Sequence, residues 1–272
     1  MAPWGRRLLA LALTVGAVAG AVVAFEDSFI YFPARPLDLT PSELGLSFEE
    51  AWLTAEDGVR IHGWFLPARG SRFTVLFAHG NAGNIGHRLD RARLMLSRLA
   101  TDVFLFDYRG YGRSEGSPGE EGTYRDARAA HDYLVGGRGI RPERLVLFGE
   151  SLGSAVVLDL ALSRPCRGLV LETPFASVAD MAREVLPILP VGKLLRTKYD
   201  NRAKAARLEV PLLVLHGDRD SVVPYAQGRR VFEAAPEPKR FFRIPGADHN
   251  DTYLTGGEAY WRELAAFLKT LE

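Results

Sequence analysis

Short unbroken apolar runs recur along the chain, and stretches with the hydrophobic spacing of helices separate them. Such runs are typical of strands that are buried on both faces of a sheet. The pattern predicts strands at 73–78, 103–106, 145–148, 169–171, 211–215 and 241–244. It predicts helices at 87–100, 124–135, 154–162 and 259–271. This alternation indicates an α/β fold with a mostly parallel central sheet and helices on both faces.

An antiparallel hairpin is predicted ahead of the first of these strands, between Ala51 and Leu66. Asp57 and Gly58 form a turn signal, and the residues on either side alternate between apolar and polar. In this alternation His62 is expected to face solvent.

The alternation of strands and helices is interrupted at about 175–205, between two predicted strands. Ser177 and Asp180 have the spacing of a capping box, and Pro187 and Pro190 interrupt the apolar stretch that follows. We expect a short cap insertion here. Its apolar face would either line an acyl pocket or pack on the core.

The N-terminus contains an uncharged run of eighteen residues, Leu8 to Phe25, with Arg6 and Arg7 before it and acidic residues after it. A helix of this length crosses about 30 Å of hydrocarbon. Arginine before the run predicts that the rest of the chain lies outside the cytoplasm.

Two interpretations of this run remain open. A cleaved signal peptide would end at small residues such as 19–21 or 22–24, whereas the unbroken length favours an uncut signal anchor. We therefore expect residues 1–27 to form a single-pass transmembrane helix. Residues 28–272 would then form one catalytic domain on the non-cytoplasmic side.

Composition gives no support for nucleic-acid binding, disulfide bonds or metal sites. A net charge of +1 over 272 residues gives no reason to expect a nucleic-acid partner. The lone Cys166 excludes an internal disulfide within the chain and a cysteine-based metal cluster. Because His, Asp and Glu do not occur together at the spacing of metal ligands, we predict no metal and no cofactor.

Chemistry is indicated by Gly149-Glu150-Ser151-Leu152-Gly153, where the apolar strand pattern changes at once into a helical one. Glycines at both ends permit a tight turn that exposes the serine hydroxyl, as in a nucleophile elbow. The N–H of Leu152, at the helix start, would face a developing oxyanion. The alternative is an ordinary serine in a strand-to-helix turn.

Partners for Ser151 follow later strands in the order Ser, Asp, His. His249 is the predicted base and Asp220 the predicted orienting acid, in preference to Asp218, which is nearer to its strand end. Asn81, in the glycine-rich loop after residue 78, is predicted to supply the second oxyanion N–H. The alternative is a plain loop, and His79 is expected to hold this loop by a hydrogen bond.

Several motifs together resemble the Bem46-like family of membrane-anchored serine hydrolases, which have the α/β-hydrolase fold. The motifs are 30–33, 79–88, 107–116, 151–153 and 249–252, and the resemblance runs from about residue 25 to the C-terminus. It implies a triad of Ser151, Asp220 and His249. Better-known relatives of that family include thioesterases that remove palmitate from proteins.

The sequence thus predicts a membrane-anchored serine hydrolase that cleaves carboxylic esters or thioesters of the carboxylesterase or acyl-thioesterase type. Its expected substrate is an acyl chain carried by a lipid or an acylated protein. A serine peptidase is the alternative within enzymes, because the same triad cleaves amides. A non-catalytic binding protein with this fold is the alternative outside them.

Overall fold

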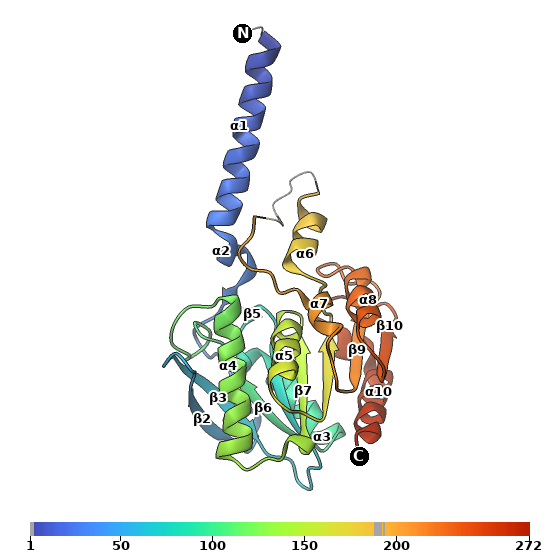
Figure 1. The fold of residues 1–272 in the computed structure, drawn as a ribbon. Coiled ribbons are helices and arrows are strands. Elements are labelled where there is room, and N and C mark those ends of the chain that lie inside the picture. Colours follow the sequence, from blue (N-terminus) through green and yellow to red (C-terminus); the bar gives the residue numbers. More distant parts are fainter. Residues whose placement is uncertain (1–2, 188–191, 193) are drawn as a thin grey trace.

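An eight-stranded sheet forms the centre of the molecule in the computed structural model (Figure 1). The structure describes residues 3–187, 192 and 194–272, without the side chains of residues 3, 6 and 8–12. The strand order is β10-β9-β8-β7-β4-β6-β3-β2, and every neighbouring pair from β10 to β6 is parallel. Only β3 pairs antiparallel with its neighbours, β2 and β6, so the predicted mostly parallel sheet is confirmed.

The strands of the eight-stranded sheet agree with the predicted strands to within a few residues. In chain order, the strands of the molecule are β1 Phe32–Pro33, β2 Glu49–Thr54, β3 Arg60–Leu66, β4 Thr74–Ala78, β5 Ala82–Gly83, β6 Asp102–Phe106, β7 Leu145–Glu150, β8 Gly168–Glu172, β9 Leu212–Gly217 and β10 Lys239–Ile244. Strands β1 and β5 form a separate parallel pair that the sequence pattern did not predict.

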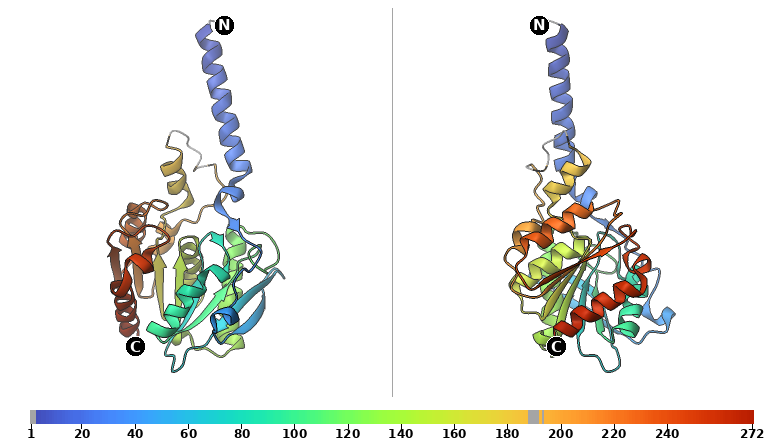
Figure 2. Two further views of the ribbon diagram at one scale, coloured as in Figure 1. Left: turned by 180° about the vertical axis from the view of Figure 1, so that it is seen from behind. Right: turned by 90° about the vertical axis from the view of Figure 1, so that its right-hand side faces the viewer.

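Helices cover both faces of the sheet (Figure 2). They are α1 Pro3–Ala24, α2 Glu26–Ile30, α3 Leu89–Arg98, α4 Glu120–Asp132, α5 Leu152–Ser163, α6 Val178–Val185, α7 Asn201–Ala205, α8 Tyr225–Ala234, α9 Thr252–Thr255 and α10 Gly257–Thr270. One core contains side chains of α4, α5 and α8, and the other those of α3 and α10. Apolar side chains on both sides of each central strand explain the unbroken apolar runs.

The predicted hairpin is present as β2 and β3, but the prediction for His62 was wrong. His62 is fully buried, and its Nε2 lies 2.9 Å from Oε1 of Glu50. Its backbone N–H donates to Oγ of Ser114, so the loop after β6 reaches this strand. Alternation did not reveal the burial because that covering loop lies about 50 residues further along the chain.

Two contacts join the N-terminal arm, which is the segment 25–36 after α1, to the insertion between β8 and β9. The carboxylate of Glu26, only 2% exposed, accepts hydrogen bonds from the backbone N–H groups of Arg196 (2.9 Å) and Thr197 (3.1 Å). The hydroxyl of Tyr31 lies 3.0 Å from that of Tyr199. Burial acts to raise the pKa of Glu26, but these N–H donors outweigh it and hold the pKa below its ordinary value.

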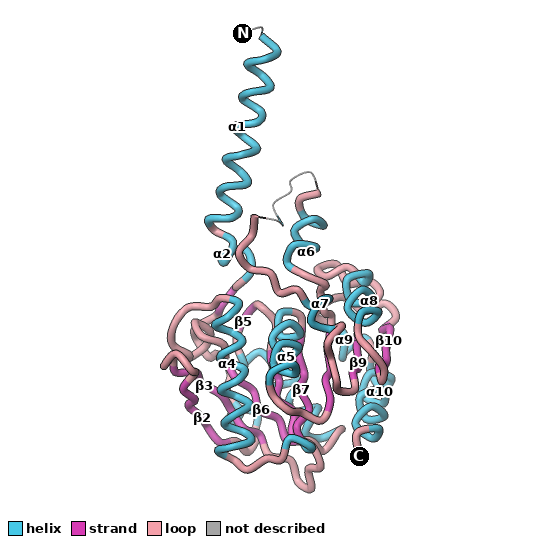
Figure 3. The backbone as a smooth tube through the Cα atoms, in the orientation of Figure 1, coloured by secondary structure: helices cyan, strands magenta, loops and turns pink. Residues whose placement is uncertain are grey.

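The insertion itself consists of α6, α7 and the connections around them (Figure 3). The Ser177 side chain caps α6 by accepting from the Asp180 N–H at 3.0 Å, which confirms one half of the predicted capping box. The Asp180 carboxylate accepts from the Ser177 hydroxyl at 2.8 Å. Val178 and Met181 pack against the core, which favours the packing interpretation for this face. The predicted break at Pro187 and Pro190 lies partly outside the described residues.

Helix α1 contains most of the run expected to cross a membrane, and it projects from the domain at the end where α6 lies (Figure 1). Within the described part of the chain, the structure has no helix with both the length and the apolar character needed for a membrane span. The predicted transmembrane helix is therefore not confirmed.

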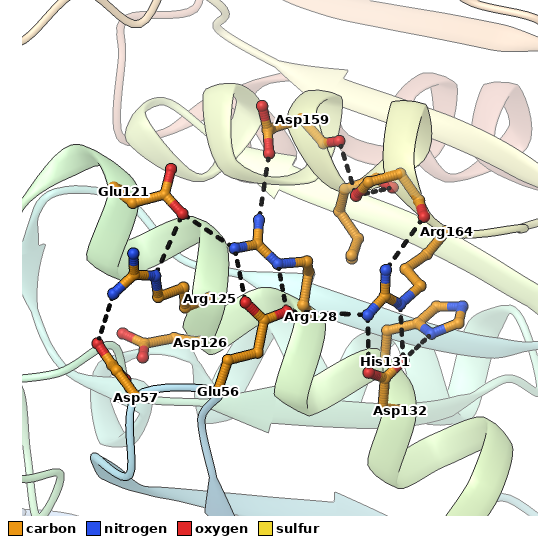
Figure 4. Close-up of polar contacts among 12 residues, drawn as sticks. Glu56, Asp57, Glu121, Arg125, Asp126, Arg128, His131, Asp132, Asp159 and Arg164 are labelled. Carbon is orange, nitrogen blue, oxygen red and sulfur yellow. Dashed lines mark hydrogen bonds and ion pairs between the residues drawn. The ribbon is translucent and has the colours of Figure 1, made fainter.

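Charged side chains join α4 to α5 and to the hairpin turn (Figure 4). Arg128 donates to Glu56 at 2.8 Å and to Glu121 at 3.0 Å, and its guanidinium lies 3.8 Å from Asp159 of α5. Arg164 makes a two-point contact with Asp132 at 2.9 and 3.0 Å. This network fixes the outer layer of helices relative to the β2–β3 hairpin.

A more deeply buried ion pair holds the loop that follows β6. Arg109 donates to Asp126 at 2.9 Å and to Asp57 at 2.7 Å, and Asp126 is fully buried. Removing Arg109 would leave a buried carboxylate without its cation. We therefore expect Arg109→Met to lower the free energy of unfolding by about 3–5 kcal/mol in urea denaturation.

The matched control is Arg93→Met, which breaks an ion pair with Asp90 whose side chains are both more than half exposed. This control should leave the unfolding midpoint essentially unchanged. Equal effects of the two substitutions would contradict the structural role of Arg109.

Candidate active site

The turn between β7 and α5 places Ser151 at the carboxyl edge of the sheet. Ser151 has φ +52° and ψ −113°, a backbone conformation that non-glycine residues rarely adopt. A Cβ on Gly149 would lie 2.3 Å from the carbonyl oxygen of Gly153. A Cβ on Gly153 would lie 2.0 Å from the carbonyl oxygen of Ala78. Both glycines are therefore required sterically, as the elbow pattern predicts.

Ser151, His249 and Asp220 form one hydrogen-bonded chain. Oγ of Ser151 lies 3.0 Å from Nε2 of His249, and Nδ1 of His249 lies 2.8 Å from Oδ2 of Asp220. Asp220 follows β9 and His249 follows β10, so neighbouring strand ends bring residues 98 and 29 positions apart into contact. Since the carboxylate can only accept, Nδ1 carries the hydrogen and Nε2 is free to take the proton of Ser151.

Hydrogen bonds hold Asp220 in its ionised form. Its Oδ1 accepts from the backbone N–H groups of Val222 (2.9 Å) and Val223 (2.7 Å). Burial acts to raise the pKa of this carboxyl, but hydrogen bonds from His216 and His249 and from the Val223 N–H outweigh it. The pKa of Asp220 therefore lies well below its ordinary value.

The other nearby carboxylates have partners of their own. Asp218, the alternative acid in the sequence, accepts from the Arg243 guanidinium at 2.8 Å and from the Gly246 N–H at 2.7 Å. Asp248 accepts from the backbone N–H of Ser221 at 2.8 Å and of His249 at 2.7 Å. These contacts shape the two loops and leave Asp220 as the carboxylate that faces His249.

The two predicted oxyanion donors come shortly after the ends of two adjacent strands, β4 and β7. Ala78 is paired with Gly149 in the β4–β7 register, so Asn81 and Leu152 each come three residues after a matched position. Leu152 begins α5, where a backbone N–H has no acceptor within the helix. The Asn81 carbonyl accepts from the Phe32 N–H and the Tyr111 hydroxyl. These contacts fix the orientation of the peptide groups beside the Asn81 N–H.

His79 holds the same loop by a hydrogen bond, as predicted from the sequence. Its Nδ1 lies 2.7 Å from the Gly80 carbonyl oxygen, and its own carbonyl accepts from the Tyr108 hydroxyl at 2.7 Å. His79 is fully buried, and its ring centroid lies 4.4 Å from that of Tyr108. It therefore supports the glycine-rich loop.

Two buried ion pairs lie next to the elbow, and sequence analysis did not predict them. Arg91 donates to Glu172 at 2.7 Å, and Arg88 donates to Glu150 at 3.0 Å. Burial acts to raise the pKa of Glu150, and the two guanidinium groups outweigh it, so this pKa lies below its ordinary value. Two charged pairs thus lie beside the nucleophile, already neutralised.

Glu172 joins the elbow to the histidine loop. Its backbone carbonyl accepts from the Ser151 N–H at 2.9 Å, and its carboxylate accepts from the Thr252 hydroxyl at 2.6 Å. Thr252 lies three residues after His249, so one residue fixes both sides of the serine–histidine contact. The available signal was a carboxylate at the end of an apolar strand on the same sheet edge.

Comparison with known proteins gives full-length relatives. The matching family model is described as serine aminopeptidase, S33, and it covers residues 70–199 and 190–252. WAV2, an α/β-hydrolase domain-containing protein of Arabidopsis thaliana, is 39% identical over 93% of this chain and 91% of its own. Protein bem46 of Schizosaccharomyces pombe is 32% identical over 96% and 91%. The Pyrococcus furiosus esterase Pf2001 has a similar fold, with a TM-score of 0.73 at 21% identity over 88% of this chain and 98% of its own.

The orienting role of Asp220 can be tested by replacing its carboxylate with an uncharged amide of the same shape. An amide in Asp220→Asn can donate to Nδ1 of His249 and so stabilise the wrong tautomer of the base. We expect the rate of Ser151 modification by a fluorophosphonate to fall about 10⁴-fold. Asp218→Asn is the control and should react at a rate near that of the wild type. The reverse ranking would assign the orienting role to Asp218.

Proposed function

Because the chain belongs to the α/β-hydrolase family that includes bem46 and WAV2, we propose that it is a serine hydrolase of carboxylic esters or thioesters. The observation that supports this proposal most directly is the continuous contact from Ser151 through His249 to Asp220, at 3.0 and 2.8 Å. A serine hydroxyl is a weak nucleophile at neutral pH, and an oriented base makes it reactive.

In the proposed reaction, Oγ of Ser151 attacks the substrate carbonyl while Nε2 of His249 accepts the hydroxyl proton. The carbonyl oxygen gains the negative charge and accepts hydrogen bonds from the N–H groups of Asn81 and Leu152. His249 then gives its proton to the departing alcohol or thiol, which leaves an acyl-serine. Water, deprotonated by His249, attacks this acyl group, releases the carboxylic acid and restores Ser151.

An acyl chain is the proposed substrate group because exposed apolar side chains occur on the segments that follow Asp220 and His249, and on the arm and the insertion. In the described chain from Phe25 onward, most exposed large apolar side chains belong to the arm, the insertion, or the loops and short helix that follow β9 and β10. These are Phe25, Phe29, Phe32, Val185, Leu194, Val222 and Leu254. Phe48 and Trp52, of the same class, belong to the hairpin region. Such a distribution favours an apolar partner such as the acyl chains of a lipid or of an acylated protein.

A serine peptidase is the second candidate, since the matching family model is described as a serine aminopeptidase. An aminopeptidase needs an anionic group to bind the substrate amine. Glu150 and Glu172, the carboxylates nearest to Ser151 in sequence or by contact, are already paired with Arg88 and Arg91. This pairing favours ester or thioester substrates over peptides with a free amine.

Serine dependence is the decisive test of the proposed reaction. Ser151→Ala should abolish fluorophosphonate labelling and lower the hydrolysis of p-nitrophenyl esters by up to about 10⁶-fold, because no other group supplies the nucleophile. Ser97→Ala, on the outer surface of α3, is the control and should retain both. Undiminished labelling of Ser151→Ala would refute the assignment. If the wild type hydrolyses aminoacyl p-nitroanilides and no ester or thioester, the peptidase alternative is correct.

Attachment to a membrane is the second part of the proposal, with the catalytic domain on the non-cytoplasmic side. It is supported by the uncharged run from Leu8 to Phe25 and by the exposure of Leu13 and Val18 on α1. The side on which the domain lies is inferred from Arg6 and Arg7 before the run.

The anchor can be tested with charges placed within this run. Lysine at a central position costs about 2.5–3.5 kcal/mol of insertion free energy per residue. We expect the double variant Val15→Lys/Val18→Lys to move from the membrane fraction to the soluble fraction. The control, Val15→Leu/Val18→Leu, should stay with the membranes and resist extraction by alkaline carbonate. A wild-type protein that is released by carbonate would refute the anchor.

A further inference from the structure

A second buried imidazole contacts the orienting carboxylate. His216 is near the end of β9 and is fully buried. Its Nε2 lies 2.9 Å from the carbonyl oxygen of Val223 and 3.3 Å from Oδ2 of Asp220. Sequence analysis did not predict this role, because the apolar pattern of β9 does not show how the loop after it folds back onto His216.

The hydrogen positions at His216 follow from its neighbours. Both atoms that face Nε2 are acceptors, a carbonyl oxygen and a carboxylate oxygen, so Nε2 must carry the hydrogen. The opposite ring atom, Nδ1, is buried and has no hydrogen-bond partner among the described residues. Oδ2 of Asp220 is therefore approached by two imidazole donors, Nε2 of His216 and Nδ1 of His249.

Close packing keeps the His216 ring in this orientation. Gly228 of α8 lies against it, and a Cβ at that position would be 2.1 Å from Nδ1 of His216. The ring of Tyr225 meets the imidazole edge-on, with centroids 5.6 Å apart and planes at 79°. The ring has little freedom to turn, because a helix without a side chain at this point fills the space beside it.

We propose that His216 is a positioning residue, which directs Oδ2 of Asp220 toward His249 and holds the loop that carries Asp220. The two backbone donors at Val222 and Val223 fix Oδ1, and His216 fixes the other carboxylate oxygen. Its bond to the Val223 carbonyl closes the loop between β9 and α8 over the same carboxylate. This inference rests on the proposed hydrolase function of the Ser151 site.

The test compares two replacements of His216 with similar volume. In His216→Gln the side-chain amide nitrogen can occupy the position of Nε2 and donate a hydrogen bond, whereas His216→Met has no donor. We expect kcat of His216→Met on p-nitrophenyl butyrate to fall about 100-fold, as for a small misplacement of a catalytic group. KM should not change, and His216→Gln should recover most of the loss.

A double variant, His216→Met combined with Asp220→Asn, distinguishes an effect on the position of Asp220 from general damage to the fold. If His216 acts through the carboxylate, His216→Met should cause no further loss in the Asp220→Asn background. Equal fold losses in both backgrounds would overturn the proposal, and so would a wild-type kcat for His216→Met or a His216→Gln variant as slow as His216→Met.

Failure of this inference can be told apart from failure of the proposed function. Labelling of wild-type Ser151 by a fluorophosphonate depends on the function alone. Absent labelling of the wild-type protein would reject both the function and the role of His216. Normal labelling together with an unchanged rate in His216→Met would reject only the positioning role.

Discussion

The site depends on a strained turn that the sheet holds in place. Ser151 has a positive φ that costs about 1–3 kcal/mol, and such strain persists only where the surrounding structure fixes it. The Ser151 N–H is bonded to the carbonyl of Glu172, and the hydroxyl of Ser154 bonds the carbonyls of Gly149 and Glu172. Because β7 lies between β4 and β8, the turn cannot relax without disturbing both neighbouring strands.

The same edge of the sheet holds the other parts of the proposed mechanism. Parallel strands direct their carboxyl ends to one side, so loops that are distant in the sequence become neighbours without long connections. Charged residues beneath the edge, among them Arg91 and Glu172, are paired with each other. Because these charges neutralise each other, Asp220 is the carboxylate that acts on His249 and, through it, on Ser151. The same ion pairs hold the residues next to the elbow in place.

Most of the fold and the proposed triad could be predicted because each signal was local. An apolar run followed by a turn residue identified the strands, and Ser151, Asp220 and His249 each came shortly after such a run. His216 was missed although Asp220 and Val223 are close to it in sequence, because an apolar pattern does not show how the loop after β9 folds back. His62 and Glu172 were missed because their surroundings are made by segments remote in sequence, the loop at Ser114 and the arginine of α3. The pairing of β1 with β5 was missed for the same reason, since prolines in the arm give no strand signal.

Glu26 stands between the projecting helix α1 and the connection at Arg196 and Thr197. Together with the Tyr31–Tyr199 contact, it holds the arm and the insertion together, although 170 residues separate Glu26 from Arg196. Any tilt of α1 relative to the sheet must therefore either carry the insertion along or break these bonds. A pull on the N-terminal helix would thus load the insertion through Glu26 before it reached β1 and the pairing of β1 with β5.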